Sequence, residues 1–247
     1  MQQVLDKFHE HGDYKQLYTD YAEVSHASWA NTQRPAYKTD QWYCHNRNRI
    51  CLELLGDLCE GRDVLSVGSR EWVEDELLKQ INGKIVRTDL IAEPEKGIIG
   101  ADVTCLPFKD QSFNVVICRE VIEHVPDADA AFTEMRRVLR QGGHLLITTP
   151  NGLSGFIDGV LHVRGYSPIS FLEELSSQGF EVIGKKGDIP YLLTGIVSFK
   201  CAEIQEILLQ DFMEIDRMTR DCEHLYYLST HLYVLCKKRD SGGLFDD

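Results

Sequence analysis

The chain has 247 residues, of which 43% are hydrophobic and 26% are charged, a balance typical of a globular protein with enough apolar material for a core. Its net charge of −13 argues against broad binding to a phosphate backbone, which requires clustered Lys and Arg, so nucleic acid is not an expected partner. No apolar run is long enough to span a bilayer, so no membrane is expected either.

The eight cysteines contain no Cys-x-x-Cys pair, which favours reduced thiols over disulfides or a metal centre. The first residues lack the basic start and apolar core of a secretory signal. We therefore expect a cytoplasmic protein. The histidines show no ligand-like spacing, so the sequence indicates no metal.

Residues 1–45 are rich in Tyr, Trp and His, and helical stretches are expected among them. Two interpretations stay open: the aromatic side chains pack on the edge of a domain, or they form a lid over a substrate. From residue 46 to 59, apolar residues recur at helical spacing, and a Glu-Gly-Arg sequence ends this predicted helix. We place a domain boundary after residue 45.

The next segments alternate between strand and helix. A short apolar strand is predicted over 63–67 and is broken by Gly68, a helix over 71–80, and a second strand over 84–88 that closes at Asp89. The run 113–118 is almost continuously apolar, which is typical of a strand covered on both faces.

A helix follows that Asp127 or Asp129 can cap, and Gly142-Gly143 is expected to end it. The next strand, 144–149, is stopped by Pro150. Ser167 and Pro168 predict the start of another helix, with Ser167 as its N-cap.

Two further strands are predicted over 180–184 and 231–236, with a helical insertion at about 185–230 between them. The tail, 241–247, is expected to be mobile. Strands that alternate with helices predict an α/β fold with a doubly wound, mostly parallel sheet.

The stretch 100–151 carries the most specific pattern. An acidic residue precedes a Leu-Pro-Phe turn, an apolar strand leads to a Glu-His pair, a helix is followed by Gly-Gly, and a strand ends in Thr-Pro-Asn. This order resembles the second half of the binding domain of class I S-adenosylmethionine (SAM) dependent methyltransferases. The resemblance covers about 46–184, and 231–236 more weakly. It implies a Rossmann-like, seven-stranded sheet whose last two strands form an antiparallel edge, a domain over 46–240, and S-adenosyl-L-methionine as cofactor.

Ligands in open α/β sheets bind beyond the carboxyl ends of the strands, so the loop Gly68, Ser69 and Arg70 is a candidate cofactor contact. The family pattern there is an acidic residue followed by Gly-x-Gly-x-Gly. Only Gly68 fills a glycine position here, and Ser66 stands in place of the acid. The missing glycines would have let the backbone approach a ligand closely. In compensation, Arg70 could pair with the SAM carboxylate and Glu71 could replace the acid.

Two acidic residues fit the other end of the cofactor. Asp89, followed by Leu90, lies about 20 residues after Gly68, where a carboxylate can accept hydrogen bonds from both ribose hydroxyls. The resemblance places Asp102 at the adenine amino group and the backbone N–H of Val103 at the adenine ring.

Arg119 and Glu120 end the strand over 113–118, which the resemblance places beneath the methionine part of SAM. Arg119 could reach the SAM carboxylate or an acidic substrate, or pair with Glu120 or Glu123. His124 is the candidate catalytic base because imidazole titrates near neutral pH. The alternative is that His124 only structures its loop.

Two residues are candidates for substrate binding. Asn151 could orient a substrate through its amide, or cap its loop. Tyr166 follows a His-Val-Arg sequence that resembles the start of a helix in the small-molecule branch of the family, and is a plausible pocket residue.

The sequence thus favours a SAM-dependent methyltransferase that acts on O or N of a small-molecule or sugar-like metabolite. Methylation of tRNA or protein is one alternative. An inactive scaffold protein that has kept the fold is another, and the glycine-poor loop is its best support. Acids at both cofactor positions argue against the scaffold. The oligomeric state stays open.

Overall fold

The structure is a computed structural model that describes residues 38–70, 72–154, 162–188, 213–215, 217–219, 222 and 224–239. Residues 1–37, Glu71 and the tail expected to be mobile lie outside the described residues. So does most of the predicted insertion at 185–230.

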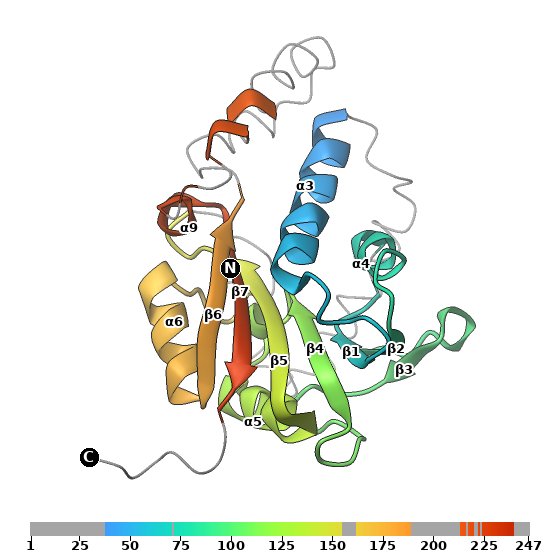
Figure 1. Ribbon diagram of the computed structural model, residues 1–247. Coiled ribbons are helices and arrows are strands. Elements are labelled where there is room, and N and C mark those ends of the chain that lie inside the picture. The colour runs from blue at the N-terminus through green and yellow to red at the C-terminus, as the bar shows by residue number, and fades with distance from the viewer. Residues whose placement is uncertain are drawn as a thin grey trace, which may run out of the picture.

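Seven strands form one sheet in the order β3-β2-β1-β4-β5-β7-β6 (Figure 1). Only β7 runs antiparallel to its neighbours, between β5 and β6, and every other pair is parallel. This confirms the predicted fold class. The elements are α3 (Lys38–Leu55), β1 (Asp63–Val67), α4 (Trp72–Leu78), β2 (Lys84–Asp89), β3 (Ile98–Gly100), β4 (Phe113–Arg119), α5 (Ala128–Val138), β5 (Leu139–Pro150), α6 (Pro168–Ser177), β6 (Phe180–Gly187), α9 (Leu225–Leu228) and β7 (His231–Lys238).

Both predicted helix caps are present. The Asp127 carboxylate accepts a hydrogen bond from the backbone N–H of Ala130 at the start of α5. Ser167 caps α6 in a reciprocal arrangement with Ser170, and Pro168 occupies the first turn. These caps fix where two helices begin, and so the direction in which the preceding loops leave the sheet.

The end of α5 differs from the prediction. We expected Gly142-Gly143 to end this helix, but α5 ends at Val138 and the glycines lie inside β5. Leu139 is extended and pairs with Phe113 of β4, and the register shifts before Val115 pairs with His144. Pairing with β4 therefore ends the helix. Gly142, with φ +66°, lies where the register of strand β5 is irregular.

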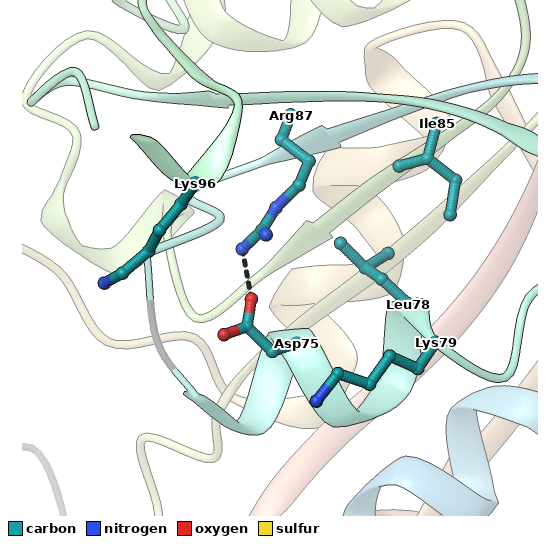
Figure 2. Close-up of a pocket in the computed structure, with 6 residues that line it drawn as sticks. All are labelled: Asp75, Leu78, Lys79, Ile85, Arg87 and Lys96. Carbon is teal, nitrogen blue, oxygen red and sulfur yellow. Dashed lines mark hydrogen bonds and ion pairs between the residues drawn. The ribbon is translucent and has the colours of Figure 1, made fainter. Parts of the chain in front are cut away.

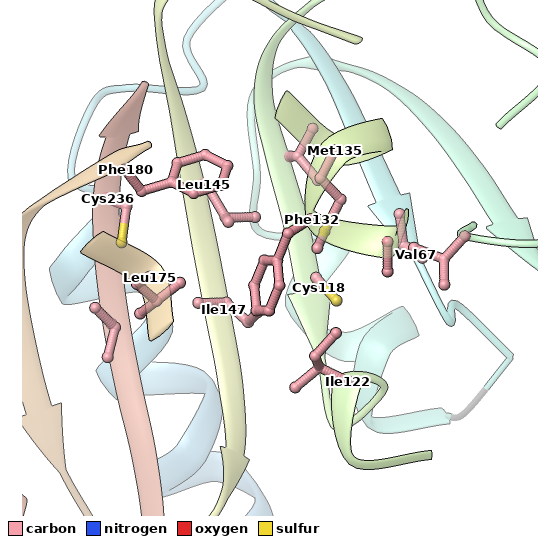
Figure 3. Close-up of a cluster of buried hydrophobic side chains, with 14 of the residues drawn as sticks. Val67, Cys118, Ile122, Phe132, Met135, Leu145, Ile147, Leu175, Phe180 and Cys236 are labelled. Carbon is pink, nitrogen blue, oxygen red and sulfur yellow. The ribbon is translucent and has the colours of Figure 1, made fainter. Parts of the chain in front are cut away.

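Helices cover both faces of the sheet (Figure 1). Phe132 and Met135 of α5 and Leu175 of α6 pack on one face, together with inward side chains of β1, β4, β5 and β7 (Figure 3). Ile50 and Leu55 of α3 pack with α4 on the other face. The expected domain boundary after residue 45 falls inside α3, which is one continuous helix.

No helix among the described residues is long and apolar enough to span a membrane. The seven cysteines in the described part of the chain are free thiols.

Candidate functional site

The parallel register brings the predicted residues to one edge of the sheet. Val67 of β1 lies level with Thr88 of β2 and Cys118 of β4, so the residues that follow each of them lie at the same edge of the sheet. Among these residues are Gly68 and Arg119. This is the carboxyl edge at which open α/β sheets bind ligands.

Gly68 cannot be replaced without strain. Its φ is +71°, and a Cβ atom added there would lie 2.2 Å from Cγ2 of Val121, in the loop after β4. Both the backbone conformation and the close approach of Val121 therefore require glycine. The one glycine of the family pattern that this chain keeps is thus needed for the turn itself.

Polar contacts hold the rest of the loop. The Ser69 backbone N–H donates to the Thr88 carbonyl at 3.0 Å, and Arg87 donates to both the hydroxyl and the carbonyl of Ser69. Arg87 also pairs with Asp75 of α4 (Figure 2). Together these contacts tie the loop to β2 and α4.

Arg70 is held by a different partner. Its Nε donates to Glu93 Oε1 at 2.7 Å, and both side chains are nearly buried. Arg70 therefore points to Glu93 in this structure, and its predicted pairing with a cofactor carboxylate would require Glu93 to share it.

The surface pocket in Figure 2 lies between α4 and β2. None of the predicted cofactor residues lines it, and its walls are Asp75, Leu78, Lys79, Ile85, Arg87 and Lys96. We therefore place the candidate site at the strand ends and not in this pocket.

A buried acid stands beside Ser66, but it is Glu74 from α4. The Ser66 hydroxyl donates to Glu74 Oε1 at 2.7 Å, and Arg119 Nη1 donates to Glu74 Oε2 at 2.9 Å. Arg119 thus pairs with Glu74 rather than with Glu120 or Glu123. Its Nε is buried and has no hydrogen-bond partner among the described residues. Glu71, which could replace the acid, lies outside them.

Asp89 and Asp102 sit at the ends of the neighbouring strands β2 and β3. Asp89 Oδ1 accepts from the backbone N–H of Ile91 at 3.0 Å, and the Asp89 carbonyl accepts from Ala101 at 2.7 Å. Asp102 Oδ1 accepts two hydrogen bonds from Thr104, each of 2.8 Å. Local bonds therefore fix both carboxylates. Leu90 follows Asp89 and is partly exposed, and Val103 follows Asp102 and is buried.

Glu120 has a strained backbone, with φ +52°. Its Oε1 accepts from the Thr148 hydroxyl at 2.7 Å and lies 3.0 Å from Nη2 of Arg47, which comes from α3. Its Oε2 lies 3.3 Å from Nε2 of His231. Burial alone would raise the pKa of Glu120, but the charges of Arg47 and His231 and the Thr148 hydrogen bond lower it to about 2.

His231 begins β7 and connects Glu120 to a second acid. Its Nδ1 lies 2.9 Å from Asp188 Oδ2, and Asp188 Oδ1 accepts the backbone N–H groups of Thr230 and His231. Two carboxylates therefore face the two ring nitrogens of one buried imidazole.

Glu123 and His124 follow in the same loop, and His162 lies beside them. The rings of His124 and His162 have centroids 4.8 Å apart. Burial and the nearby charge of Glu120 raise the pKa of Glu123 well above its usual value, and burial lowers the pKa of His162. The predicted base is thus one member of a polar cluster.

Asn151 is fully buried and bonds to backbone on both sides. Its amide nitrogen donates to the Ser229 carbonyl at 2.8 Å, and its Oδ1 accepts from the backbone N–H of Leu153 at 3.0 Å. This is the loop-capping arrangement. Tyr166 is also buried, and its hydroxyl lies 3.4 Å from Arg164 Nη1.

Sequence reasoning missed Arg47, Glu74, Asp188 and His231 as members of the site. Arg47 and Glu74 lie on predicted helices, and His231 opens a predicted strand, but a charged residue at such a place is usually solvated. No local signal distinguishes these residues, because they meet only when separate elements pack.

Comparison with known proteins agrees with this geometry. Residues 73–147 match the family model of a methyltransferase domain. A probable S-adenosylmethionine-dependent methyltransferase of Mycolicibacterium smegmatis is 31% identical over 155 residues, which make up 57% of this chain and 60% of that protein. The chain therefore spans less than two thirds of this relative's length.

Two solved structures share the fold. A putative sarcosine dimethylglycine methyltransferase from Galdieria sulphuraria has a TM-score of 0.57 at 17% identity, over 90% of this chain and 99% of that one. The 1,6-didemethyltoxoflavin-N1-methyltransferase of Burkholderia thailandensis, solved with bound S-adenosylhomocysteine, has a TM-score of 0.55 at 15% identity, over 90% of both chains. The sheet order, the motifs and these relatives agree: the chain has the fold of class I S-adenosylmethionine-dependent methyltransferases, and its residues 73–147 match a methyltransferase domain.

Proposed function

We propose that this protein is a SAM-dependent methyltransferase, and that SAM lies along the carboxyl ends of β1, β2 and β4. The observation that carries the proposal is the pair Asp89 and Asp102, two locally fixed carboxylates at adjacent strand ends. Asp89 would accept the ribose hydroxyls. Asp102 and the backbone N–H of Val103 would bind the adenine. The named function of the mycobacterial relative supports the same cofactor.

The methionine end of SAM fits a polar group that has no hydrogen-bond partner within the described part of the chain. Buried Arg119 Nε needs an acceptor, because an unsatisfied buried donor is costly. The carboxylate of the amino-acid part of SAM would supply that acceptor. In this proposal Arg119 binds the carboxylate, while Arg70 keeps Glu93 and supports the loop together with Gly68 and Ser69.

We place the methyl acceptor at the polar cluster formed by Glu120, Glu123, His124, His162 and His231. The acidic net charge of −13 favours a small-molecule or sugar-like acceptor, methylated at O or N, over tRNA. Catalysis would come mainly from holding the acceptor in line with the methyl group that SAM supplies. His124 would take the proton from the acceptor.

The two residues predicted to bind substrate would act by holding their own segments in place. Asn151 would hold its loop in place through its hydrogen bonds to backbone groups. Tyr166 would support the segment before α6 through its contact with Arg164. We place the protein in the cytoplasm, which agrees with the free thiols of the described residues.

Calorimetric titration with SAM and with S-adenosylhomocysteine tests the cofactor. We expect saturable binding of both ligands. A folded sample that binds neither would overturn the proposal and favour a non-catalytic binding protein, which the glycine-poor loop and the Arg70–Glu93 pair would then explain. Release of S-adenosylhomocysteine in a screen of small hydroxyl and amine compounds then tests the acceptor.

A further inference from the structure

Three side chains with metal-ligating atoms meet at the carboxyl end of β4. The candidate ligand atoms of Glu123, His124 and His162 all lie within 4.8 Å of one another. His124 Nε2 is 4.0 Å from Glu123 Oε1. Glu123 and His124 are neighbours in the sequence, whereas His162 comes from the segment before α6.

Glu123 offers a buried side-chain oxygen that could bind a cation. Its side chain is 2% exposed, and its Oε1 has no hydrogen-bond partner among the described residues. Its Oε2 lies 3.3 Å from the Thr149 hydroxyl of β5, which orients the carboxylate. A buried carboxylate oxygen without a donor is unfavourable unless a ligand completes it.

Backbone hydrogen bonds hold His162 beside this acid. The Glu123 carbonyl accepts from the backbone N–H of Val163 at 2.9 Å and of Arg164 at 3.4 Å. Arg164 Nη2 also donates to the Pro126 carbonyl at 2.7 Å. The segment that carries His162 is thus fastened to the loop that carries His124, so the two imidazoles are positioned together.

We propose that Glu123, His124 and His162 form a binding site for one divalent transition-metal ion of the zinc or cobalt type. Two imidazoles and one carboxylate suit these ions, and three protein ligands leave a coordination position open. Metal–ligand bonds of about 2.0–2.1 Å require the three side chains to draw closer together than they now lie. No ligand spacing in the sequence indicates this site, because its members come together only in the fold.

The consequence for catalysis rests on the proposed function. The open coordination position would take the oxygen or nitrogen of the substrate. A coordinated hydroxyl loses its proton to solvent more readily, and the oxygen can then form the new bond to carbon as the sulfonium–carbon bond breaks. In the metal-bound protein His124 is a ligand, and in the metal-free protein it is the base.

The experiment titrates the chelator-treated full chain with Co²⁺ and follows the visible absorption, with Zn²⁺ as competitor. We expect one Co²⁺ per chain, displaced by Zn²⁺, and at least tenfold weaker binding in His124→Ala and in His162→Ala. His224→Ala, which removes an exposed imidazole elsewhere, is the matched control and should bind as the parent does.

Two results would overturn the metal site: no Co²⁺ signal in the parent chain, or equal affinity in all three variants. Thermal melting of each variant shows whether a loss of binding is a loss of folding. If His162→Ala fails to fold, Glu123→Gln serves as the second test, since it keeps the shape of the side chain. SAM titration of the same samples is independent, so failure of the metal site and failure of the proposed function are read separately.

Discussion

Glu74 on α4 and Arg119 at the end of β4 form an ion pair of 2.9 Å in which both side chains are almost completely buried. Ser66 of β1 donates a further hydrogen bond to the same carboxylate. Ser66 stands where the family pattern has an acidic residue, so Glu74 places a carboxylate beside that position. An acid from helix α4 therefore stands next to the strand that leads into the candidate loop 68–70, and Arg119 balances its charge.

Arg119→Met should destabilise the protein by about 3–5 kcal/mol, because it leaves the Glu74 carboxylate buried without its charge partner. Urea unfolding without ligand measures this. The double variant Glu74→Gln with Arg119→Met removes both charges and should recover most of the loss. Equal stability of the two variants would show that the pair is not energetically coupled.

Gly68→Ala should destabilise the protein more than Gly97→Ala. Both glycines have φ near +70°, but a Cβ atom at Gly97 meets nothing within 4 Å, whereas at Gly68 it meets Val121. The backbone cost of about 1–2 kcal/mol is shared, and the clash should add about 1–3 kcal/mol at Gly68 alone. The free energies of unfolding of the two variants measure the difference, and adding Val121→Ala to Gly68→Ala should reduce it.

Asp89→Ala should weaken SAM binding at least tenfold, because each hydrogen bond from a ribose hydroxyl to a charged acceptor contributes about 1.5–3 kcal/mol. Calorimetry measures the affinity. Asp89→Asn keeps a side-chain oxygen that can accept from the backbone N–H of Ile91. It therefore tests the loss of the charge without the loss of the turn. Asp57→Ala, on an exposed turn, is the neutral control. Unchanged affinity in a folded Asp89→Ala variant would reject the placement of the cofactor.

His124→Ala should lower turnover more than it lowers SAM affinity, because His124 acts on the acceptor and not on the cofactor. Steady-state release of S-adenosylhomocysteine, once an acceptor is known, gives the turnover. His224→Ala should leave both quantities unchanged. If His124→Ala has the activity of the parent, His124 is neither the catalytic base nor a metal ligand that the reaction needs.

Glu120→Gln should reduce stability at pH 7, where the ionised carboxylate pairs with Arg47 and His231. A folded-state pKa of about 2, below the unfolded value, means that this contribution is present above about pH 5 and is lost as the pH falls toward 2. Urea unfolding at pH 7 and at pH 3 should show the gap between parent and variant narrowing. A constant gap would mean that the Glu120 charge does not stabilise the fold.

Much of the fold could be predicted from local pattern. The apolar run 113–118 and the strand that closes at Asp89 lie where we expected them, and Asp127 and Ser167 cap their helices as predicted. These features depend on residues close together in the chain, so the sequence carries them directly. The short strand β3 was not placed from the sequence, because its three residues form a strand only by pairing with β2.

The tertiary structure alone decided where α5 ends and which side chains surround the site. The glycines at 142–143 predict the end of a helix, but the pairing of Leu139 with Phe113 ends the helix earlier. Glu74 reaches Ser66, and His162 reaches Glu123, across segments far apart in the chain. The sequence by itself determined the order of strands and helices and the acids at the strand ends. Packing determined the partners of the buried charges, because a buried charge is tolerated only where another element brings its counterpart.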